Sequence, residues 1–188
     1  MILETVVDIC KRKYKDYKIY LHNFAKFDGY LLLKHLAQLG FFDPVVHKGR
    51  IIKCGFTLYE TGITVTFMDS YLLLTSSLRK LCKSFSVKTT KSFFPFLLQD
   101  INYKGIVPDI NLFNGINTEE FENYLIEFKD KIWNFKEESV KYCNLDCISL
   151  FEILEKFSQI IFNKFQLNIT KYPTLPSLAF AIFKTHYL

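Results

Sequence analysis

Apolar residues recur along the first third of the chain with two periods, one typical of helices and one typical of strands. Helical spacing covers residues 1–16 and 30–39, and a glycine follows the second segment. Runs of branched, aromatic or alternating side chains cover residues 17–21, 44–59 and 63–69, which favours strands. Because a Lys-Gly pair near the centre of residues 44–59 has the composition of a tight turn, we expect a hairpin there.

The rest of the chain favours helices. A Ser-Ser pair precedes a helical pattern over residues 78–85, and acidic residues open a second helix at Thr118. The strongest helical pattern covers residues 136–166, and a final amphipathic segment covers residues 177–187. Residues 88–117 contain several Pro and Gly and show no regular period. The apolar stripe expected to be buried along the longest helix consists of Val140, Cys143, Cys147, Leu150, Phe151 and Leu154.

This order of elements predicts an α/β domain, with a mixed sheet flanked by helices and a helical C-terminal part. A chain of 188 residues is long enough to bury a core of its own. The strands are few for a complete sheet, and we therefore expect the N-terminal side of the sheet to be incomplete.

Composition narrows the classes of function. Hydrophobic residues make up 49% of the chain, which excludes a disordered protein. No apolar run approaches the roughly 20 residues that cross a bilayer, and no signal-peptide pattern is present, so we expect no membrane partner. A net charge of +5 mildly favours a polyanionic partner, although an ordinary basic protein has the same charge. Phe, Tyr, Ile, Lys and Asn are abundant, and their AT-rich codons are typical of mitochondrial, plasmid or viral genes.

Five cysteines are scattered along the chain, and no two form a Cys-x-x-Cys pair. Cys143 and Cys147 have helical spacing, but no second pair of ligands accompanies them. We therefore expect all five to be buried, reduced thiols rather than zinc ligands or disulfides.

Polar residues gather directly after the first predicted strand. Tyr20, His22 and Asn23 lie at its end, and Asp28 precedes the next helix. The carboxyl ends of strands are where open α/β sheets bind their ligands. Asp28 also has the composition of a helix cap, so a functional and a structural interpretation are both open.

A tyrosine and an aspartate lie one turn apart on the longest predicted helix. Tyr142 and Asp146 therefore share a face of that helix. Carboxylates hold the divalent cations of phosphodiester hydrolysis, so Asp28 and Asp146 are candidate metal ligands. The Tyr142 hydroxyl could orient the attacking water, whereas a surface pair without function would have the same spacing.

Together these motifs resemble the 3′–5′ exonuclease domain of family B DNA polymerases, and most closely its protein-primed branch. The segment from Tyr20 to Asp28 resembles the second exonuclease motif, Asn-x-x-x-Phe-Asp preceded by Tyr-x-His. The pair Tyr142-x-x-x-Asp146 resembles the third motif. The resemblance implies an RNase H-like fold for the domain.

Two further elements lie between these motifs in the order of the family. Asp69-Ser70 followed by Ser77-Leu78 is similar to the Ser/Thr-Leu-x-x-hydrophobic element, which contacts single-stranded DNA in the family. Lys91 begins a Lys-x-x-hydrophobic element, whose lysine meets phosphate charge.

The resemblance implies a role for each matching residue. Aromatic side chains suit a frayed primer end because they stack on bases without reading sequence. Core packing explains Leu78 equally well, and Lys88 is an alternative to Lys91.

The implied DNA-binding residues are Tyr20, His22, Asn23, Phe27, Ser77 and Leu78. The implied catalytic residues are Asp28, Lys91, Tyr142 and Asp146. The implied metal is Mg²⁺ or Mn²⁺, held by Asp28 and Asp146. The implied partners are single-stranded DNA, a terminal protein and deoxynucleotides.

The chain departs from the family in its first exonuclease motif, Asp-x-Glu. Ile2 stands where the aspartate would precede Glu4, and no polymerase motif follows. We therefore expect a fragment of a polymerase with weak exonuclease activity at most. In this interpretation residues 1–170 form a partial exonuclease-like domain. Residues 171–188 begin the connection to an absent polymerase palm.

Two other interpretations of the chain are open. One is a non-catalytic remnant that binds single-stranded DNA, and the other is a degenerate product whose open sheet edge makes it poorly stable. The expected location is the mitochondrion, with a virus or cytoplasmic plasmid as the alternative.

Overall fold

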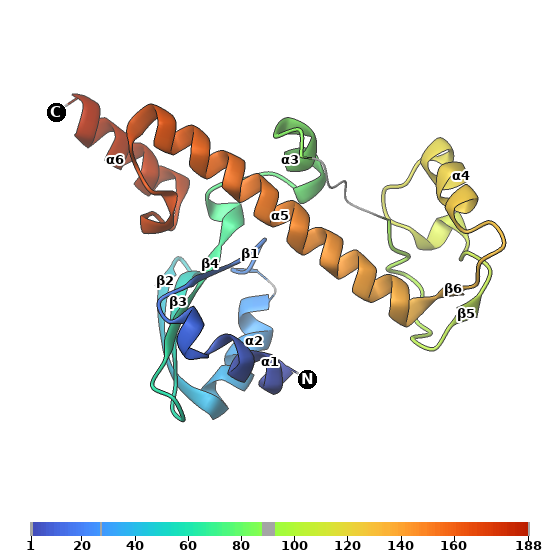
Figure 1. Ribbon diagram of the computed structural model, residues 1–188, viewed down its shortest axis with the longest axis horizontal. Coiled ribbons are helices and arrows are strands. Elements are labelled where there is room, and N and C mark those ends of the chain that lie inside the picture. The colour runs from blue at the N-terminus through green and yellow to red at the C-terminus, as the bar shows by residue number, and fades with distance from the viewer. Residues whose placement is uncertain (1, 27, 88–92, 188) are drawn as a thin grey trace. The chain divides into compact units, whose positions relative to one another are not determined.

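The structure consists of two compact units (Figure 1). One unit, here called the sheet unit, comprises Met1–Ser77 and Leu154–Leu188, and the other, the aromatic unit, comprises Leu78–Ile153. The residues that the computed structural model describes are 2–26, 28–87 and 93–187.

The sheet unit contains a four-stranded mixed sheet. Its strands are β1 (Lys18–Leu21), β2 (Gly40–His47), β3 (Arg50–Leu58) and β4 (Thr64–Asp69), in the order β1-β4-β3-β2. β1 and β4 run parallel, whereas β4 with β3 and β3 with β2 run antiparallel. The predicted mixed α/β class is therefore confirmed.

The hairpin between β2 and β3 turns at the Lys-Gly pair, as predicted. Lys48 has φ 49° and Gly49 has φ 72°. Two consecutive residues at positive φ give the tight turn whose twist matches that of the flanking strands. The residue types at the turn were sufficient to predict the hairpin.

Two helices pack against the apolar side of the sheet. They are α1 (Ile2–Ile9) and α2 (Asp28–Leu39), and α2 ends where Gly40 starts β2. The prediction of one helix over residues 1–16 is wrong beyond α1, because the apolar positions stop at Cys10 and a charged 3-10 turn, Arg12–Tyr14, follows. The buried residues of this core are Val6, Cys10, Phe24, Leu36, Ile51, Cys54, Phe56, Leu58, Val65 and Phe67.

The longest helix is α5 (Phe135–Phe165), which contributes residues to both units. A 3-10 turn (Ile169–Lys171) and α6 (Leu175–Tyr187) follow it in the sheet unit. The first turn of α6 is capped reciprocally, because Ser177 N donates to Thr174 Oγ1 at 3.3 Å and Thr174 N donates to Ser177 Oγ at 3.2 Å.

The aromatic unit has short elements around a core of rings. It contains α3 (Leu78–Ser84), α4 (Thr118–Glu127) and a two-stranded sheet of β5 (Lys104–Gly105) and β6 (Trp133–Asn134). The rest of its described residues before α4 are largely irregular, as the sequence predicts. The buried residues of this core are Phe94, Phe113, Tyr124, Phe128, Trp133 and Tyr142.

Two predictions about buried side chains on α5 are wrong. Cys143 and Cys147 are exposed, whereas the other three cysteines are buried as expected. Val140 and Phe151, which belong to the same expected apolar stripe, are 61% and 67% exposed. Helical spacing predicts which residues share a face, but not whether another element covers that face.

Across the described part of the chain, no helix is both long enough and apolar enough to span a membrane.

Candidate functional site

The parallel pairing of β1 and β4 brings the carboxyl ends of two strands together. Leu21 is the register partner of Asp69, the last residue of β4. The residues that follow each strand, His22 and Asn23 after β1 and Ser70 after β4, therefore meet at one edge of the sheet. This is the position where open α/β sheets place polar sites.

Asp69 joins the two strand ends through backbone hydrogen bonds. Its side chain is buried, and the residue is only 1% exposed. The carboxylate accepts hydrogen bonds from the backbone N–H groups of Asn23, Ala25 and Tyr71, each at 2.9 Å. Asn23 lies in the left-handed region with φ 72°, a conformation that Asn adopts more readily than most residues. The loop after β1 is thus held by a charged group rather than by its own turn chemistry alone.

Both ring nitrogens of His22 are engaged by the protein. Nε2 lies 2.9 Å from the Ser76 carbonyl, and Nδ1 lies 3.0 Å from Ser70 Oγ. A carbonyl only accepts, so Nε2 carries a proton. Ser70 Oγ, which contacts Nδ1, also donates its single proton to the Leu21 carbonyl at 3.1 Å. The ring also packs edge-on against Tyr71, with centroids 5.5 Å apart. A ligand that bonds to a His22 nitrogen would therefore have to displace one of these contacts.

One polar side chain of the same stretch, Tyr20, has unused hydrogen-bonding capacity. The Tyr20 hydroxyl is buried and has no partner among the residues that the structure describes. Burial raises the pKa of Tyr20 to about 12, so the hydroxyl keeps its proton at neutral pH. Leaving a buried hydroxyl unpaired costs roughly 1–3 kcal/mol. This cost would be recovered if a ligand bonded to the hydroxyl.

Asp28 is the first residue of α2, where a carboxylate interacts favourably with the helix dipole. It is half-buried. The position of Asp28 at the start of α2 is therefore sufficient to explain why an acidic residue stands there. Phe27, the residue before it, lies outside the described residues, as do Lys91 and its alternative Lys88.

The other half of the predicted site lies on α5 in the aromatic unit. Tyr142 and Asp146 are one turn apart on this helix, as their spacing predicts. The Tyr142 ring belongs to the aromatic core, with centroids 5.6 Å from Phe94 and 5.5 Å from Phe96. Packing thus explains why an aromatic residue stands at position 142. Because Asp28 and Asp146 belong to different units, the structure tests neither their convergence nor their common metal site.

The other two residues expected to bind DNA, Ser77 and Leu78, differ in environment. Ser77 is exposed, and Leu78, the first residue of α3, is 7% exposed and belongs to a core. Sequence reasoning placed Asp69 and Ser70 in an element expected to contact DNA but gave neither residue a role of its own. Both are buried at the end of β4. The signal that could have found them is their position directly at the end of a strand with alternating pattern.

The described residues do not by themselves form a metal cage. Within them, no group of three or more His, Cys, Asp or Glu side chains lies close enough to hold an ion. A two-metal site stabilises both the attacking and the leaving oxygen and needs several carboxylates. We therefore derive no catalytic step through a metal.

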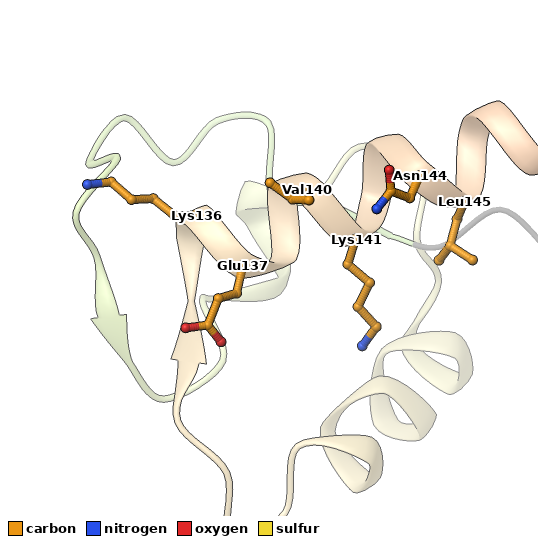
Figure 2. Close-up of a pocket in the computed structure, with 6 residues that line it drawn as sticks. All are labelled: Lys136, Glu137, Val140, Lys141, Asn144 and Leu145. Atoms are coloured by element: carbon orange, nitrogen blue, oxygen red, sulfur yellow. The ribbon is translucent and has the colours of Figure 1, made fainter. Parts of the chain in front are cut away.

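The surface of the described residues has two hollows. One, of about 520 Å³, is lined only by α5 side chains between Lys136 and Leu145 (Figure 2). Neither Tyr142 nor Asp146 lines it. The other, of about 450 Å³, includes three lysines and one aspartate and is reached by Lys18 from β1. Strand alternation places Lys18 on the same face of β1 as Tyr20, and Met68, the register partner of Tyr20, also lines this hollow.

Comparisons with known proteins identify relatives over nearly the whole chain. Residues 8–188 match the family described as DNA polymerase type B, organellar and viral. A probable DNA polymerase of Neurospora intermedia is 43% identical, in a match covering 96% of this chain and 20% of that protein. A probable DNA polymerase of Ascobolus immersus is 34% identical, and the match covers 91% of this chain and 15% of that protein. The chain thus spans a fifth or less of the length of these two relatives.

A solved structure of Phi29 DNA polymerase complexed with single-stranded DNA is also similar. It is 21% identical with a TM-score of 0.40, and the match covers 68% of this chain and 25% of that one. A likeness at this level carries no argument about the site, and the assignment to a family rests on the sequence matches.

Proposed function

The chain belongs to the type B DNA polymerases of organelles and viruses, and from this premise we propose that it is the proofreading exonuclease portion of a protein-primed polymerase. In this proposal its RNase H-like domain binds the single-stranded end of a primer at the carboxyl ends of β1 and β4. The observation that carries the proposal is the buried Asp69, which ties the loop after β1 to the end of β4.

The proposed binding groove has an aromatic and a polar part. Tyr20 supplies a ring on which a base can stack and a buried hydroxyl without a partner in the described part of the chain. The Asn23 side chain makes no hydrogen bond to any described residue, so its amide can bond to a phosphate or a sugar. Stacking on aromatic side chains is independent of sequence, as a proofreading site requires.

Family B polymerases use divalent metals, and by family the ions here are Mg²⁺ or Mn²⁺. We propose Asp28 and Asp146 as their ligands, Tyr142 as the residue that orients water, and Lys91 as the phosphate contact. Because the described residues contain no group of three ligands, we expect little nuclease activity from this chain alone. Replication of a mitochondrial or plasmid element, with a terminal protein and deoxynucleotides as partners, is the corresponding role of the whole polymerase.

A second candidate function is binding of single-stranded DNA without catalysis. It needs only the strand-end loop, whose backbone is held by the buried Asp69. Release of nucleotides from single-stranded DNA with magnesium, lost in Asp146→Ala, would support the nuclease. Binding without release would support the second candidate.

Binding of a fluorescent oligothymidine at low salt tests the site that both candidates share. Tyr20→Ala should weaken binding by the stacking contribution of one base, roughly 1–3 kcal/mol. Tyr59→Ala is a matched control, because Tyr59 is 72% exposed and follows the other end of the sheet. Equal effects of the two substitutions, or no binding by the unaltered chain, would contradict the proposal.

A further inference from the structure

Asp69 accepts more hydrogen bonds than an aspartate that only caps a turn. Asp109 provides the comparison, since it precedes a 3-10 turn (Ile110–Leu112) and accepts a backbone bond from Asn111 at 2.8 Å. Asp69 makes the same local bond to Tyr71. It makes two more, to Asn23 and Ala25, which lie more than forty residues earlier in the chain.

These two additional bonds stabilise a loop conformation that is costly without support. A non-glycine residue in the left-handed region, such as Asn23 with φ 72°, persists where the surroundings determine its conformation. Hydrogen bonds to an ionised carboxylate are about twice as strong as neutral ones. The buried carboxylate in turn needs several donors to offset its loss of water. The loop and Asp69 therefore stabilise each other.

We propose that Asp69 is the positioning residue of the strand-binding loop, residues 22–26. The carboxylate sets the backbone at Asn23 and so presents the Asn23 amide to the bound strand, without contacting that strand itself. This role rests on the proposed function, because it concerns the same loop that binds single-stranded DNA.

The substitution Asp69→Asn is diagnostic because it keeps the shape and changes the acceptors. Oδ1 accepts from Asn23 and Tyr71, and Oδ2 accepts from Ala25. An asparagine has one oxygen and one NH₂ group. Whichever way the amide is turned, at least one backbone N–H faces another donor. The matched control is Asp109→Asn, which alters a cap of the same local type in the other unit.

The experiment is a double-mutant cycle on oligothymidine affinity, with Asp69→Asn, Asn23→Gly and the two combined. Glycine adopts positive φ readily, so Asn23→Gly removes the amide while the backbone can keep its conformation. We expect Asp69→Asn to weaken binding about tenfold, the effect of losing one charge-assisted hydrogen bond. In the Asn23→Gly background the same change should add little, because its effect passes through the Asn23 side chain. Asp109→Asn should leave affinity unchanged.

If the effects of Asp69→Asn and Asn23→Gly on affinity add fully in the double variant, Asp69 only supports the fold. That result would overturn the proposal. Hydrogen exchange in the unaltered chain gives a test that does not depend on whether the variants fold. The amides of Asn23 and Ala25 should exchange as slowly as those of β4, and exchange at the rate of exposed loops would also overturn it.

The proposed function and this role fail in different ways. If the unaltered chain does not bind oligothymidine while Asn23 and Ala25 remain protected, the proposed function is wrong and Asp69 only orders a loop. If the chain binds and Asn23→Gly weakens binding but Asp69→Asn does not, the positioning role is wrong and the site stands.

Discussion

The two halves of the predicted site have opposite physical characters. In the sheet unit, His22 and Asn23 lie in a network of hydrogen bonds centred on Asp69 and Ser70. In the aromatic unit, Tyr142 lies among the rings of a core. From the sequence, both segments are expected to belong to one site. The comparison teaches that a motif residue such as Tyr142 can be explained by the packing of its side chain, whereas the backbone of Asn23 is held by a hydrogen bond to Asp69.

The largest effect should follow from breaking the packing of the aromatic unit. Trp133 is fully buried, and its Nε1 donates to the Tyr124 hydroxyl at 2.8 Å. Trp133→Ala should lower the free energy of unfolding of this unit by about 3–5 kcal/mol, because it leaves a cavity and an unpaired hydroxyl. Ile132→Ala is the control, since Ile132 is 74% exposed. Urea unfolding measures both, and a loss for Trp133→Ala no larger than the control would contradict the account.

A smaller effect should follow from breaking the polar network of the sheet unit. Ser70 is fully buried, and its hydroxyl lies 3.0 Å from His22 Nδ1 and 3.1 Å from the Leu21 carbonyl. Ser70→Ala should cost about 1–3 kcal/mol of unfolding free energy, because these buried groups lose a partner. It should also weaken oligothymidine binding, which Trp133→Ala should affect only through stability.

The control for Ser70 is Ser139→Ala. Ser139 also donates its hydroxyl to a carbonyl, that of Lys136 at 2.9 Å, but on an exposed surface of α5. Exposed polar groups regain water when a bond is lost, so we expect a change within about 0.5 kcal/mol. Equal losses for the two serines in thermal or urea unfolding would show that the strand-end network has no special importance.

The smallest effect should follow from removing an exposed lysine that pairs with two glutamates and lies 5.6 Å from the centroid of the Phe128 ring. Lys141 Nζ lies 3.4 Å from Glu127 Oε1 and 3.6 Å from Glu138 Oε2. All three carboxylate and ammonium groups are reached by solvent. Lys141→Ala should change the unfolding free energy by less than about 1 kcal/mol, and by less still at high salt. A larger and salt-independent loss would mean that charge, and not ring packing, stabilises this unit.

The sequence was sufficient for elements whose causes are local. The hairpin turn at Lys48-Gly49 and the end of α2 before Gly40 follow from glycine chemistry and spacing. The helix at Thr118 follows from its acidic first turn, and its capping box, Asn117 with Glu120, completes it. The end of α1 at Ile9 was missed because helical spacing continued weakly into a charged turn.

The sequence was not sufficient for features that depend on distant pairing. Asp69 reaches Asn23 only because β4 pairs with β1, from which α2 and the β2–β3 hairpin separate it in sequence. Tyr142 enters a core whose other rings come from irregular segments such as that around Phe94. Cys143 and Cys147 are exposed because nothing in helical spacing says which face is covered. Each of these depends on tertiary contacts that no local pattern records.

The central claim is that the strand-end loop of the sheet unit binds single-stranded DNA. Amide chemical shifts recorded while oligothymidine is added test it most directly. We predict that the amides of Tyr20, Asn23 and Ala25 shift together and saturate, while those of Trp133 and Tyr124 in the aromatic core stay in place. Shifts confined to Lys53 and Lys171 of the lysine-lined hollow, or no saturable shift at Asn23, would contradict the claim.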